Sequence, residues 1–169
     1  MTTPLICPAR PGDAIDIVAL VRELADYEHA LDQVAISVDD LERALFTPNP
    51  HVHCLVAEHD GAIVAMALWF LHFSTWTGTS GLYLEDLYVQ DRHRGRGIGT
   101  QLMRALAVMC VEEGYSRFEW SVLDWNRPAI EFYQSIGAIA LDEWTRYRLS
   151  GVALRNYARA IDVTPPSLQ

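Results

Sequence analysis

The spacing of apolar residues along the chain predicts four helices. In each of them apolar residues recur at every third or fourth position, which places them on one face of a helix. The pattern is clearest at Ile98, Leu102 and Leu106, and Gly114 is placed to end that helix. Ser37, with Asp40 three residues later, is typical of a helix N-terminus. The expected helices cover 13–31, 37–46, 98–113 and 127–136.

Short runs rich in β-branched and aromatic residues predict strands around these helices. Two of the runs are separated by His59, Asp60 and Gly61, which is typical of a hairpin turn. The expected strands cover 5–8, 52–58, 62–73, 81–90, 118–123 and 144–149. Together the elements follow the order β-αα-βββ-α-β-α-β. We therefore expect a mixed α/β fold with a central sheet of about six to seven strands and helices on both faces.

The length of the chain predicts one domain. Its 169 residues show no internal repeat and have the size of an ordinary domain, which we expect to cover 1–163. The last residues, 164–169, include Pro165 and Pro166, which prevent a regular helix or strand. We expect a flexible tail there.

The negative charge of the chain disfavours nucleic-acid partners and favours cationic ones. The formal net charge is −9, and all 13 basic side chains are arginines. An acidic chain is a poor general binder of nucleic-acid phosphates and suits cations, so we expect no nucleic-acid partner and favour a cationic one. The absence of lysine excludes Schiff-base chemistry on a lysine of this chain.

The apolar segments do not predict a membrane protein. The longest uncharged run, 61–84, is apolar only over 62–71, which is shorter than the roughly 20 residues that span a bilayer. Residues 1–4 lack the features of a signal peptide, so we expect a soluble, cytoplasmic protein. Three cysteines cannot pair completely, and their apolar neighbours favour buried thiols. His51 and His53 share a strand face without a third ligand, so no metal site is expected.

The segment 90–100, between a predicted strand and a predicted helix, is the most informative. Gly95, Gly97 and Gly99 occupy alternate positions, where they allow tight turns and leave backbone N–H groups accessible. With the N-terminus of the following helix these groups suit a phosphate or diphosphate. Thr100 stands where a dinucleotide-binding motif has its third glycine, and the chain has no Gly-Lys-Ser/Thr. The loop is either a diphosphate site of another kind or a basic turn that only connects strand to helix.

The sequence Arg94-Gly95-Arg96-Gly97-Ile98-Gly99 resembles the Arg/Gln-x-x-Gly-x-Gly/Ala motif of the GNAT superfamily of N-acetyltransferases. The element order is also that of the superfamily. A closer resemblance, to the diamine (spermidine/spermine) N-acetyltransferases, is carried by four stretches, 23–28, 53–58, 82–87 and 125–133. The resemblance implies a GNAT fold, acetyl-CoA as co-substrate and a homodimer.

The resemblance also implies which residues bind acetyl-CoA. A β-bulge in the strand 81–90 would free backbone groups for the pantetheine arm. The loop before the helix 98–113 and the start of the helix 127–136 would hold the rest, and Asn126 is placed to cap the latter helix. The residues implied are Leu87, Tyr88, Val89, Arg94, Gly95, Arg96, Gly97, Ile98, Gly99, Thr100, Asn126, Pro128 and Ala129.

Acetylation of an amine requires a base near the amine and an acid near the departing sulfur, because an alkyl ammonium has a pKa of about 10.4. Glu85 is the candidate base. It stands beside Asp86 in an otherwise apolar strand, where carboxylates are costly unless they are solvated or paired. The two acids fit either a cation site or an arrangement in which one pairs with an arginine and the other meets solvent. The resemblance implies that Glu85 contacts the substrate amine and accepts its proton.

Tyr133 is the candidate acid. Its place on the helical stripe of Ala129, Phe132 and Ile136 also fits a core tyrosine. The resemblance to the family motif Asn-x-Pro-x-x-x-Phe-Tyr, which begins here at Asn126, implies instead that the Tyr133 hydroxyl faces the thioester sulfur.

Five residues are candidates for binding the amine substrate besides Glu85. Glu28 lies on the apolar stripe of the first helix, where a carboxylate either reaches solvent at the helix end or receives a cation. The resemblance places Tyr27 and Glu28 at a polyamine site and matches Trp76 to a family tryptophan, although Trp76 also fits an ordinary surface aromatic. Asp86 completes the acidic pair. In the diamine N-acetyltransferases, acids of the turn that corresponds to 137–144 help bind the distal amine. This turn is shorter here, and the resemblance implies that Asp142 takes the place of those acids.

These features predict an acetyl-CoA-dependent N-acetyltransferase that moves acetyl directly to a primary amine of a small cationic substrate, a di- or polyamine or an amino-acid-like amine. The shorter turn 137–144, and Arg127 in place of an acidic residue, leave the full-length polyamine substrate open. One alternative is a GNAT enzyme that acts on a drug-like amine or a protein N-terminus. The other is a CoA-binding sensor without turnover, against which the retention of Glu85 and Tyr133 argues.

Overall fold

The computed structural model describes residues 3–159. The chain divides into two compact units, residues 1–121 and residues 122–169. The first unit contains the sheet and the second contains two helices. Our expectation of one domain over 1–163 stays a prediction, and the expected tail, 164–169, lies outside the described residues.

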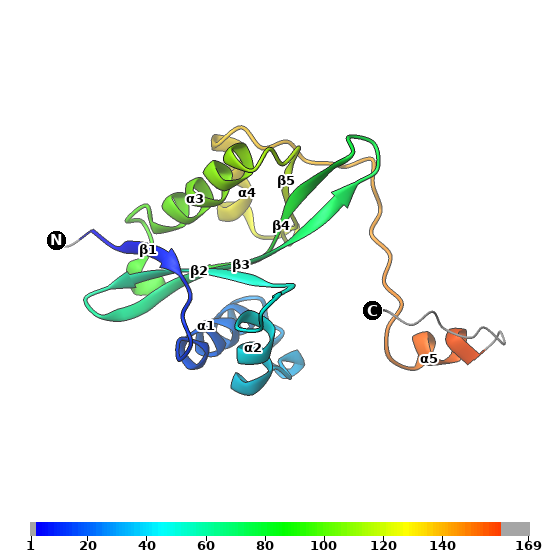
Figure 1. Ribbon diagram of the computed structural model, residues 1–169, viewed down its shortest axis with the longest axis horizontal. Coiled ribbons are helices and arrows are strands. Elements are labelled where there is room, and N and C mark those ends of the chain that lie inside the picture. The colour runs from blue at the N-terminus through cyan, green and yellow to red at the C-terminus, as the bar shows by residue number, and fades with distance from the viewer. Residues whose placement is uncertain (1–2, 160–169) are drawn as a thin grey trace. The chain divides into compact units, whose positions relative to one another are not determined.

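A five-stranded sheet forms the centre of the first unit, with its strands in chain order (Figure 1). The first four strands pair antiparallel, and the fifth joins the fourth in parallel. The mixed sheet confirms the predicted fold class, although it has fewer strands than expected. The strands are β1 (Leu5–Pro8), β2 (His53–His59), β3 (Ala62–Ser74), β4 (Thr79–Val89) and β5 (Phe118–Trp120).

Helices cover both faces of this sheet, as predicted (Figure 1). Helices α1 (Ala14–Tyr27) and α2 (Val38–Leu45) lie on one face, and α3 (Ile98–Glu112) lies on the other. Two short 3₁₀ helices, η1 (Leu31–Gln33) and η2 (Asp91–His93), lie in the connections.

The core between α1, α2 and the sheet is apolar. Ile17 and Leu20 of α1 and Met66 of β3 are at most 1% exposed, and burial of a side chain of this size contributes about 1.5–3 kcal/mol relative to exposure. The predicted first helix is too long, since α1 ends at Tyr27. His29 adopts a left-handed backbone conformation with φ of 59°, which ends the helix.

Local sequence chemistry sets other element ends as predicted. Ser37 and Asp40 form the capping box of α2. The Asp40 N–H donates to Ser37 Oγ at 3.1 Å, and the Ser37 N–H donates to Asp40 Oδ2 at 3.1 Å. The β2–β3 hairpin turns at Asp60 and Gly61, both of which have positive φ.

The second unit contains α4 (Arg127–Ser135) and α5 (Gly151–Arg159). Helix α4 confirms a prediction, including its cap: the Ala129 N–H donates to Asn126 Oδ1 at 3.4 Å. Helix α5 was not expected, although alanine, leucine and arginine within it are good helix formers.

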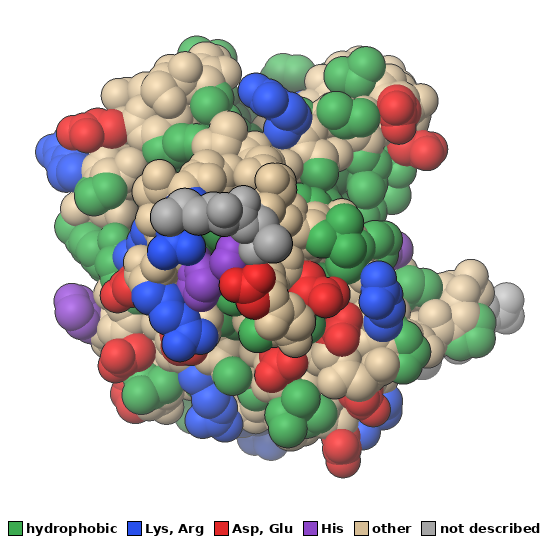
Figure 2. Space-filling model, turned by 90° about the vertical axis from the view of Figure 1, so that its left-hand side faces the viewer, with side chains coloured by type: hydrophobic (Ala, Val, Ile, Leu, Met, Phe, Trp, Pro, Cys, Tyr) green, Lys and Arg blue, Asp and Glu red, His purple; other side chains and the backbone are tan. Residues whose placement is uncertain are grey.

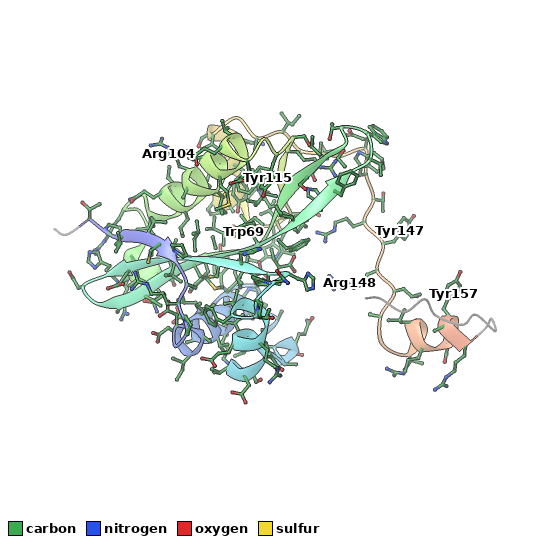
Figure 3. All side chains as sticks on the ribbon, viewed as in Figure 1. Trp69, Arg104, Tyr115, Tyr147, Arg148 and Tyr157 are labelled. Atoms are coloured by element: carbon green, nitrogen blue, oxygen red, sulfur yellow. The ribbon has the colours of Figure 1, made fainter. Side chains whose placement is uncertain are left out.

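The predicted strand 144–149 is wrong. No strand in the described part of the chain pairs with it, and Trp144, Tyr147 and Leu149 are 66%, 94% and 48% exposed. Figure 3 shows Tyr147 and Arg148 on this extended segment. The alternation of apolar and polar residues predicts an extended backbone, but a strand also requires a neighbour's N–H and C=O groups. The sheet therefore has five strands instead of about six to seven.

Charged side chains of both signs are interspersed on the face drawn in Figure 2. In the described part of the chain, ion pairs between residues three apart join Arg43 with Asp40 and Arg94 with Asp91. Exposed pairs of this kind contribute about 0–1 kcal/mol to stability. Among residues 3–159, no helix is both long enough and apolar enough to cross a membrane.

Candidate active site

A β-bulge interrupts β4 at Glu85. The ladder with β3 pairs Leu84 with Trp69 and Asp86 with Leu68, so Glu85 is the extra residue on this strand. The bulge that the family resemblance implies for this strand is thereby confirmed.

The bulge decides which β4 side chains share a face. Tyr83 pairs with Phe70, and Asp86 pairs with Leu68. Phe70 and Leu68 are two residues apart on β3 and share a face, so Tyr83 and Asp86 share it too, although they are three residues apart. Leu68 belongs to the core that packs against α1 and α2. Asp86 therefore lies on the α1 side of the sheet.

The charges of two carboxylates, Glu85 and Glu28, act on a third, Asp86, and we call the three residues the acidic cluster. Glu28 is the C-cap residue of α1. Burial, and then the charges of Glu85 and Glu28, raise the pKa of Asp86 to about 6. Burial also raises the pKa of Glu28. A bound cation would offset both the burial and the repulsion, so the acidic cluster suits an ammonium group.

One edge of β4 is open beyond Leu84. Strand β5 pairs with β4 over three residues that end at Leu84. Within the described chain no strand pairs with that edge of 85–89, while the other edge pairs with β3. An open edge presents backbone N–H and C=O groups that can bind an extended ligand. The predicted cofactor contacts Leu87, Tyr88 and Val89 lie in this segment.

The loop before α3 has the backbone geometry of a phosphate site. Gly95 and Gly97 have φ of 73° and 76°, a left-handed conformation that favours glycine. Ile98, the first residue of α3, is 2% exposed and fixes the helix in the core. The first-turn N–H groups, up to those of Gly99 and Thr100, have no carbonyl partner within the helix. They fit an anion such as a diphosphate.

The arginines of this loop differ in their contacts. Arg92 donates to a neighbouring glutamine side chain at 3.0 Å. The guanidinium carbon of Arg94 lies 4.8 Å from the ring centre of Tyr27 and 5.3 Å from that of Tyr88. Arg96 is exposed, where its charge is accessible to an anion. The side chain of Arg94 is thus engaged with the protein itself.

Further predicted site residues belong to the second unit. Tyr133 lies on α4 with its ring tilted against Phe132, the ring centres being 5.4 Å apart. The predicted cofactor contacts Asn126, Pro128 and Ala129 form the start of the same helix, and Asp142 is exposed in a turn. The roles of these residues stay predictions.

Trp76 lies at the turn between β3 and β4 and is 89% exposed, which fits both interpretations of this residue. His53, considered above as a ligand, stacks on Trp69 with 4.3 Å between ring centres. Across residues 3–159 no group of three or more His, Cys, Asp or Glu side chains is arranged to hold a metal ion. The cysteines are free thiols, and burial raises the pKa of Cys54 to about 12.

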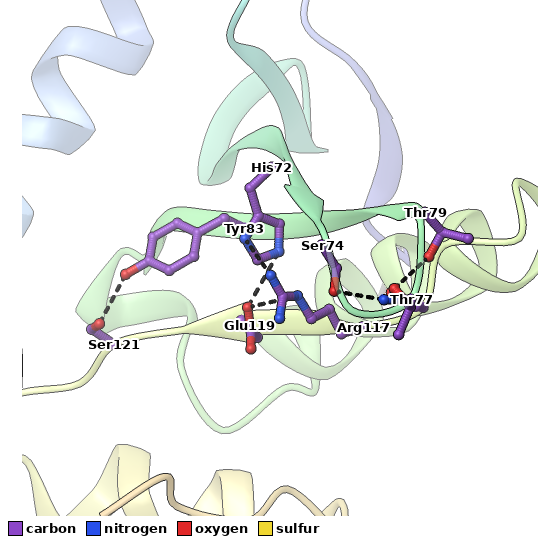
Figure 4. A network of polar contacts seen from close by, with 9 residues as sticks. His72, Ser74, Thr77, Thr79, Tyr83, Arg117, Glu119 and Ser121 are labelled. Carbon is purple, nitrogen blue, oxygen red and sulfur yellow. Dashed lines mark hydrogen bonds and ion pairs between the residues drawn. The ribbon is translucent and has the colours of Figure 1, made fainter. Parts of the chain in front are cut away.

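A polar network that the sequence analysis missed crosses the sheet near the bulge (Figure 4). Glu119 Oε2 of β5 lies 3.2 Å from His72 Nε2 of β3 and 3.2 Å from Arg117 Nε. Tyr83, on the intervening strand, packs edge-on against His72, and its hydroxyl lies 2.8 Å from Ser121 Oγ. The network fastens the short β5 to the sheet beside the open edge. Only the register of three strands could have revealed it.

Comparison with known proteins identifies the family. Residues 19–138 match the family model described as Acetyltransferase (GNAT) family. The thialysine N-epsilon-acetyltransferase of Sus scrofa is 40% identical over 169 residues, which cover 94% of this chain and 99% of that protein. The L-ornithine N5-acetyltransferase of Arabidopsis thaliana is 32% identical over 123 residues, 73% of this chain and 51% of that protein.

A further relative and a solved structure are also similar to this chain over most of its length. A human spermidine/spermine N(1)-acetyltransferase-like protein is 32% identical over 160 residues, 89% of this chain and 23% of that protein. The solved structure of an integron cassette protein from V. cholerae aligns with a TM-score of 0.79 and 29% identity over 95% of this chain and 100% of that one. These findings confirm the resemblance found in the loop motif and the four stretches. This chain is an N-acetyltransferase and belongs to the GNAT family.

Proposed function

We propose that this enzyme transfers acetyl from acetyl-CoA to the primary amine of a small cationic substrate, a diamine, a polyamine or an amino-acid-like amine. The acidic cluster at the β4 bulge supports the proposal most directly. The negative charges of Glu85 and Glu28 oppose the ionisation of Asp86, and a bound ammonium would offset that repulsion. The names of the similar proteins also specify amine-bearing compounds, namely thialysine, ornithine and spermidine or spermine.

The residues of the first unit fit acetyl-CoA as the co-substrate. The left-handed Gly95 and Gly97 and the first turn of α3 would bind its diphosphate through N–H groups, and Arg96 would add positive charge. Backbone groups on the open edge of 85–89 would bind its pantetheine arm. Acetyl-CoA supplies the acetyl group as an activated thioester.

Glu85 is the proposed general base. Its side chain is exposed, whereas Asp86 and Glu28 are half-buried, so Glu85 is the member of the cluster best placed to exchange a proton with an amine that enters from solvent. The carboxylates of Asp86 and Glu28 would hold the cationic substrate in place. Tyr133 is the proposed proton donor to the departing sulfur, an assignment supported by the family motif around Asn126.

The family resemblance also supports a homodimer. The formal net charge of −9 supports the absence of a nucleic-acid partner, and we propose a cytoplasmic location with no membrane partner. Analytical ultracentrifugation tests the oligomeric state, since a homodimer sediments with twice the 19.0 kDa mass of the chain. A single species at the mass of one chain would contradict it.

The proposed function is tested by acetyl transfer to a panel of amines, measured as release of the CoA thiol. The panel contains putrescine, spermidine, ornithine, thialysine, a drug-like amine and a lysine-free peptide with a free N-terminus. We expect the highest kcat/KM among the first four compounds. A higher value for the drug-like amine or the peptide would favour a different acceptor, and no release with any amine would indicate a sensor.

The role of Glu85 is tested by Glu85→Gln. We expect kcat/KM for the amine to fall by about 10²–10⁴-fold, most strongly below neutral pH, because the variant lacks the group that accepts the proton. Glu112→Gln changes another exposed glutamate, at the end of α3; it is the matched control and should leave kcat/KM unchanged. Equal rates for Glu85→Gln and the wild type would exclude Glu85 as the base.

A further inference from the structure

Arg94 joins three parts of the first unit. Its Nε donates to the Val89 carbonyl at the end of β4 at 2.9 Å, and its Nη1 lies 2.8 Å from Asp91 Oδ1 in η2. The same guanidinium lies 4.8 Å from the ring centre of Tyr27 on α1 and 5.3 Å from that of Tyr88 on β4. A flat cation held by directional contacts and by two aromatic rings has little freedom to move.

A second set of contacts fastens the same loop to α1. Gln90, just before η2, donates through Nε2 to Glu23 Oε1 of α1 at 2.9 Å. Burial, and then the charge of Glu23, raise the pKa of Tyr88, so Glu23 also acts on this residue of β4. Glu23 and Tyr27 are four residues apart, so they lie on one face of α1. The start of the phosphate loop is thus fixed to the C-terminal half of this helix.

The same end of α1 carries part of the amine site. Tyr27 is its last residue, and Glu28, its C-cap residue, belongs to the acidic cluster. We propose that Arg94 is a positioning residue that couples the two substrate sites, so that a coenzyme bound in the loop holds Tyr27 and Glu28 in the arrangement that binds the amine. This inference rests on the proposed function.

The physical basis is the order of residues in the loop. Arg94 directly precedes Gly95, and a loop with glycines at alternate positions loses conformational freedom when an anion binds its N–H groups. When the loop becomes ordered, the backbone of Arg94 becomes ordered with it. The guanidinium of Arg94 then restricts the position of Tyr27 through its contact with the ring. The last turn of α1 contains no basic residue, so Arg94 also places a positive charge near a helix C-terminus, where the helix dipole favours one.

Calorimetry measures this coupling. The amine of the panel that the wild type acetylates fastest is titrated alone and with saturating CoA, and the ratio of the two dissociation constants is the coupling factor. We expect about fivefold or more for the wild type, and a factor of roughly one for Arg94→Gln. Arg94→Lys keeps the charge without the flat fork and should retain part of the factor. Arg104→Gln, on the exposed side of α3 (Figure 3), is the matched control and should not change it.

Tyr27 gives a second, independent test. Tyr27→Phe keeps the ring beneath the guanidinium and should keep the coupling factor. Tyr27→Leu removes the ring and should lower the factor by about as much as Arg94→Gln does. Where Arg94→Gln does not fold, as judged by its thermal unfolding, this pair of variants decides.

Two results would overturn the inference while acetyl transfer remains intact. One is a coupling factor of one in the wild type. The other is an Arg94→Gln protein that binds CoA less tightly but keeps the wild-type factor, because Arg94 would then be a cofactor contact only. A wild type that acetylates no amine would instead refute the proposed function.

Discussion

His72 and Glu119 meet across strand β4, with 3.2 Å between Nε2 of the one and Oε2 of the other (Figure 4). They belong to β3 and β5, the two neighbours of β4, and the crossing occurs at Gly81, the residue that pairs with His72. A Cβ at position 81 would collide with His72 Nε2 and would lie 2.8 Å from Arg117 Cγ. The contact between His72 and Glu119 therefore requires glycine at this position.

Gly81→Ala should destabilise the protein for this reason. The added methyl group must displace His72 and Arg117 from Glu119, and overpacking of this kind costs about 1–3 kcal/mol. The free energy of unfolding is measured by equilibrium unfolding in urea.

Two comparisons keep this prediction specific. In Gly99→Ala the new Cβ meets only Val89 Cγ2 at 3.8 Å, an ordinary contact, so the free energy of unfolding should not fall. In a His72→Ala background, Gly81→Ala should cost less than in the wild type, because one of the displaced groups is gone. An equal cost in both backgrounds would show that His72 does not require the glycine.

The parts of the fold that depend on residues close together in the sequence could be predicted from the sequence. The capping box of Ser37 and Asp40 and the turn at Asp60 and Gly61 follow from local hydrogen bonding and from local backbone conformation. The segment 144–149 was wrongly predicted to be a strand, because a strand requires a partner strand, and the alternation of apolar and polar residues in the segment does not show whether one is present.

In the candidate site too, features formed by consecutive residues could be predicted, and features that depend on strand register or packing could not. The loop around Gly97 is visible in the sequence because its chemistry lies in consecutive residues. The pairing of His72 with Glu119 depends on the register of three strands, and the contact of Arg94 with Tyr27 depends on how α1 packs against the sheet. Asp86 was identified, but its position on the α1 face is a consequence of the bulge at Glu85.

Gly97→Ala tests the backbone of the phosphate loop. Gly97 has φ of 76° and no atom within 4 Å of a Cβ built on it, so the substitution adds backbone strain without a collision. We expect about 1–2 kcal/mol loss of stability and a higher KM for acetyl-CoA. Gly97→Asn should be milder, because asparagine tolerates the left-handed conformation. Equal KM values for the wild type and Gly97→Ala would separate this residue from cofactor binding.

Tyr133→Phe tests the proposed acid. The ring that packs on Phe132 remains, and the urea midpoint measures whether the variant is still folded. The hydroxyl that would donate a proton is lost, and kcat should fall by about 10²–10⁴-fold. Steady-state kinetics at saturating amine give kcat. A wild-type kcat in Tyr133→Phe would assign this tyrosine to packing.

Asp86 should make the protein less stable as the pH rises. Its pKa is about 6 in the folded protein, above the value of about 3.9 for an unfolded chain. Between these two values the folded state holds a proton that the unfolded state has released, so the free energy of unfolding decreases with increasing pH in that window. The expected decrease is on the order of 2 kcal/mol, and it is measured by urea unfolding at several pH values between pH 4 and pH 7, a window of about three units.

Asp86→Asn should weaken this dependence, leaving the part that comes from the raised pKa of Glu28, and should raise the free energy of unfolding at neutral pH by on the order of 1–2 kcal/mol, since position 86 then buries no charge. The same change should raise KM for the amine, because the acidic cluster loses one of the charges that hold the cation. Asp32→Asn, at an exposed aspartate in η1, is the control and should change neither quantity. A variant that is less stable than the wild type at neutral pH, or one that keeps the wild-type KM, would show that the burial of Asp86 does not serve cation binding.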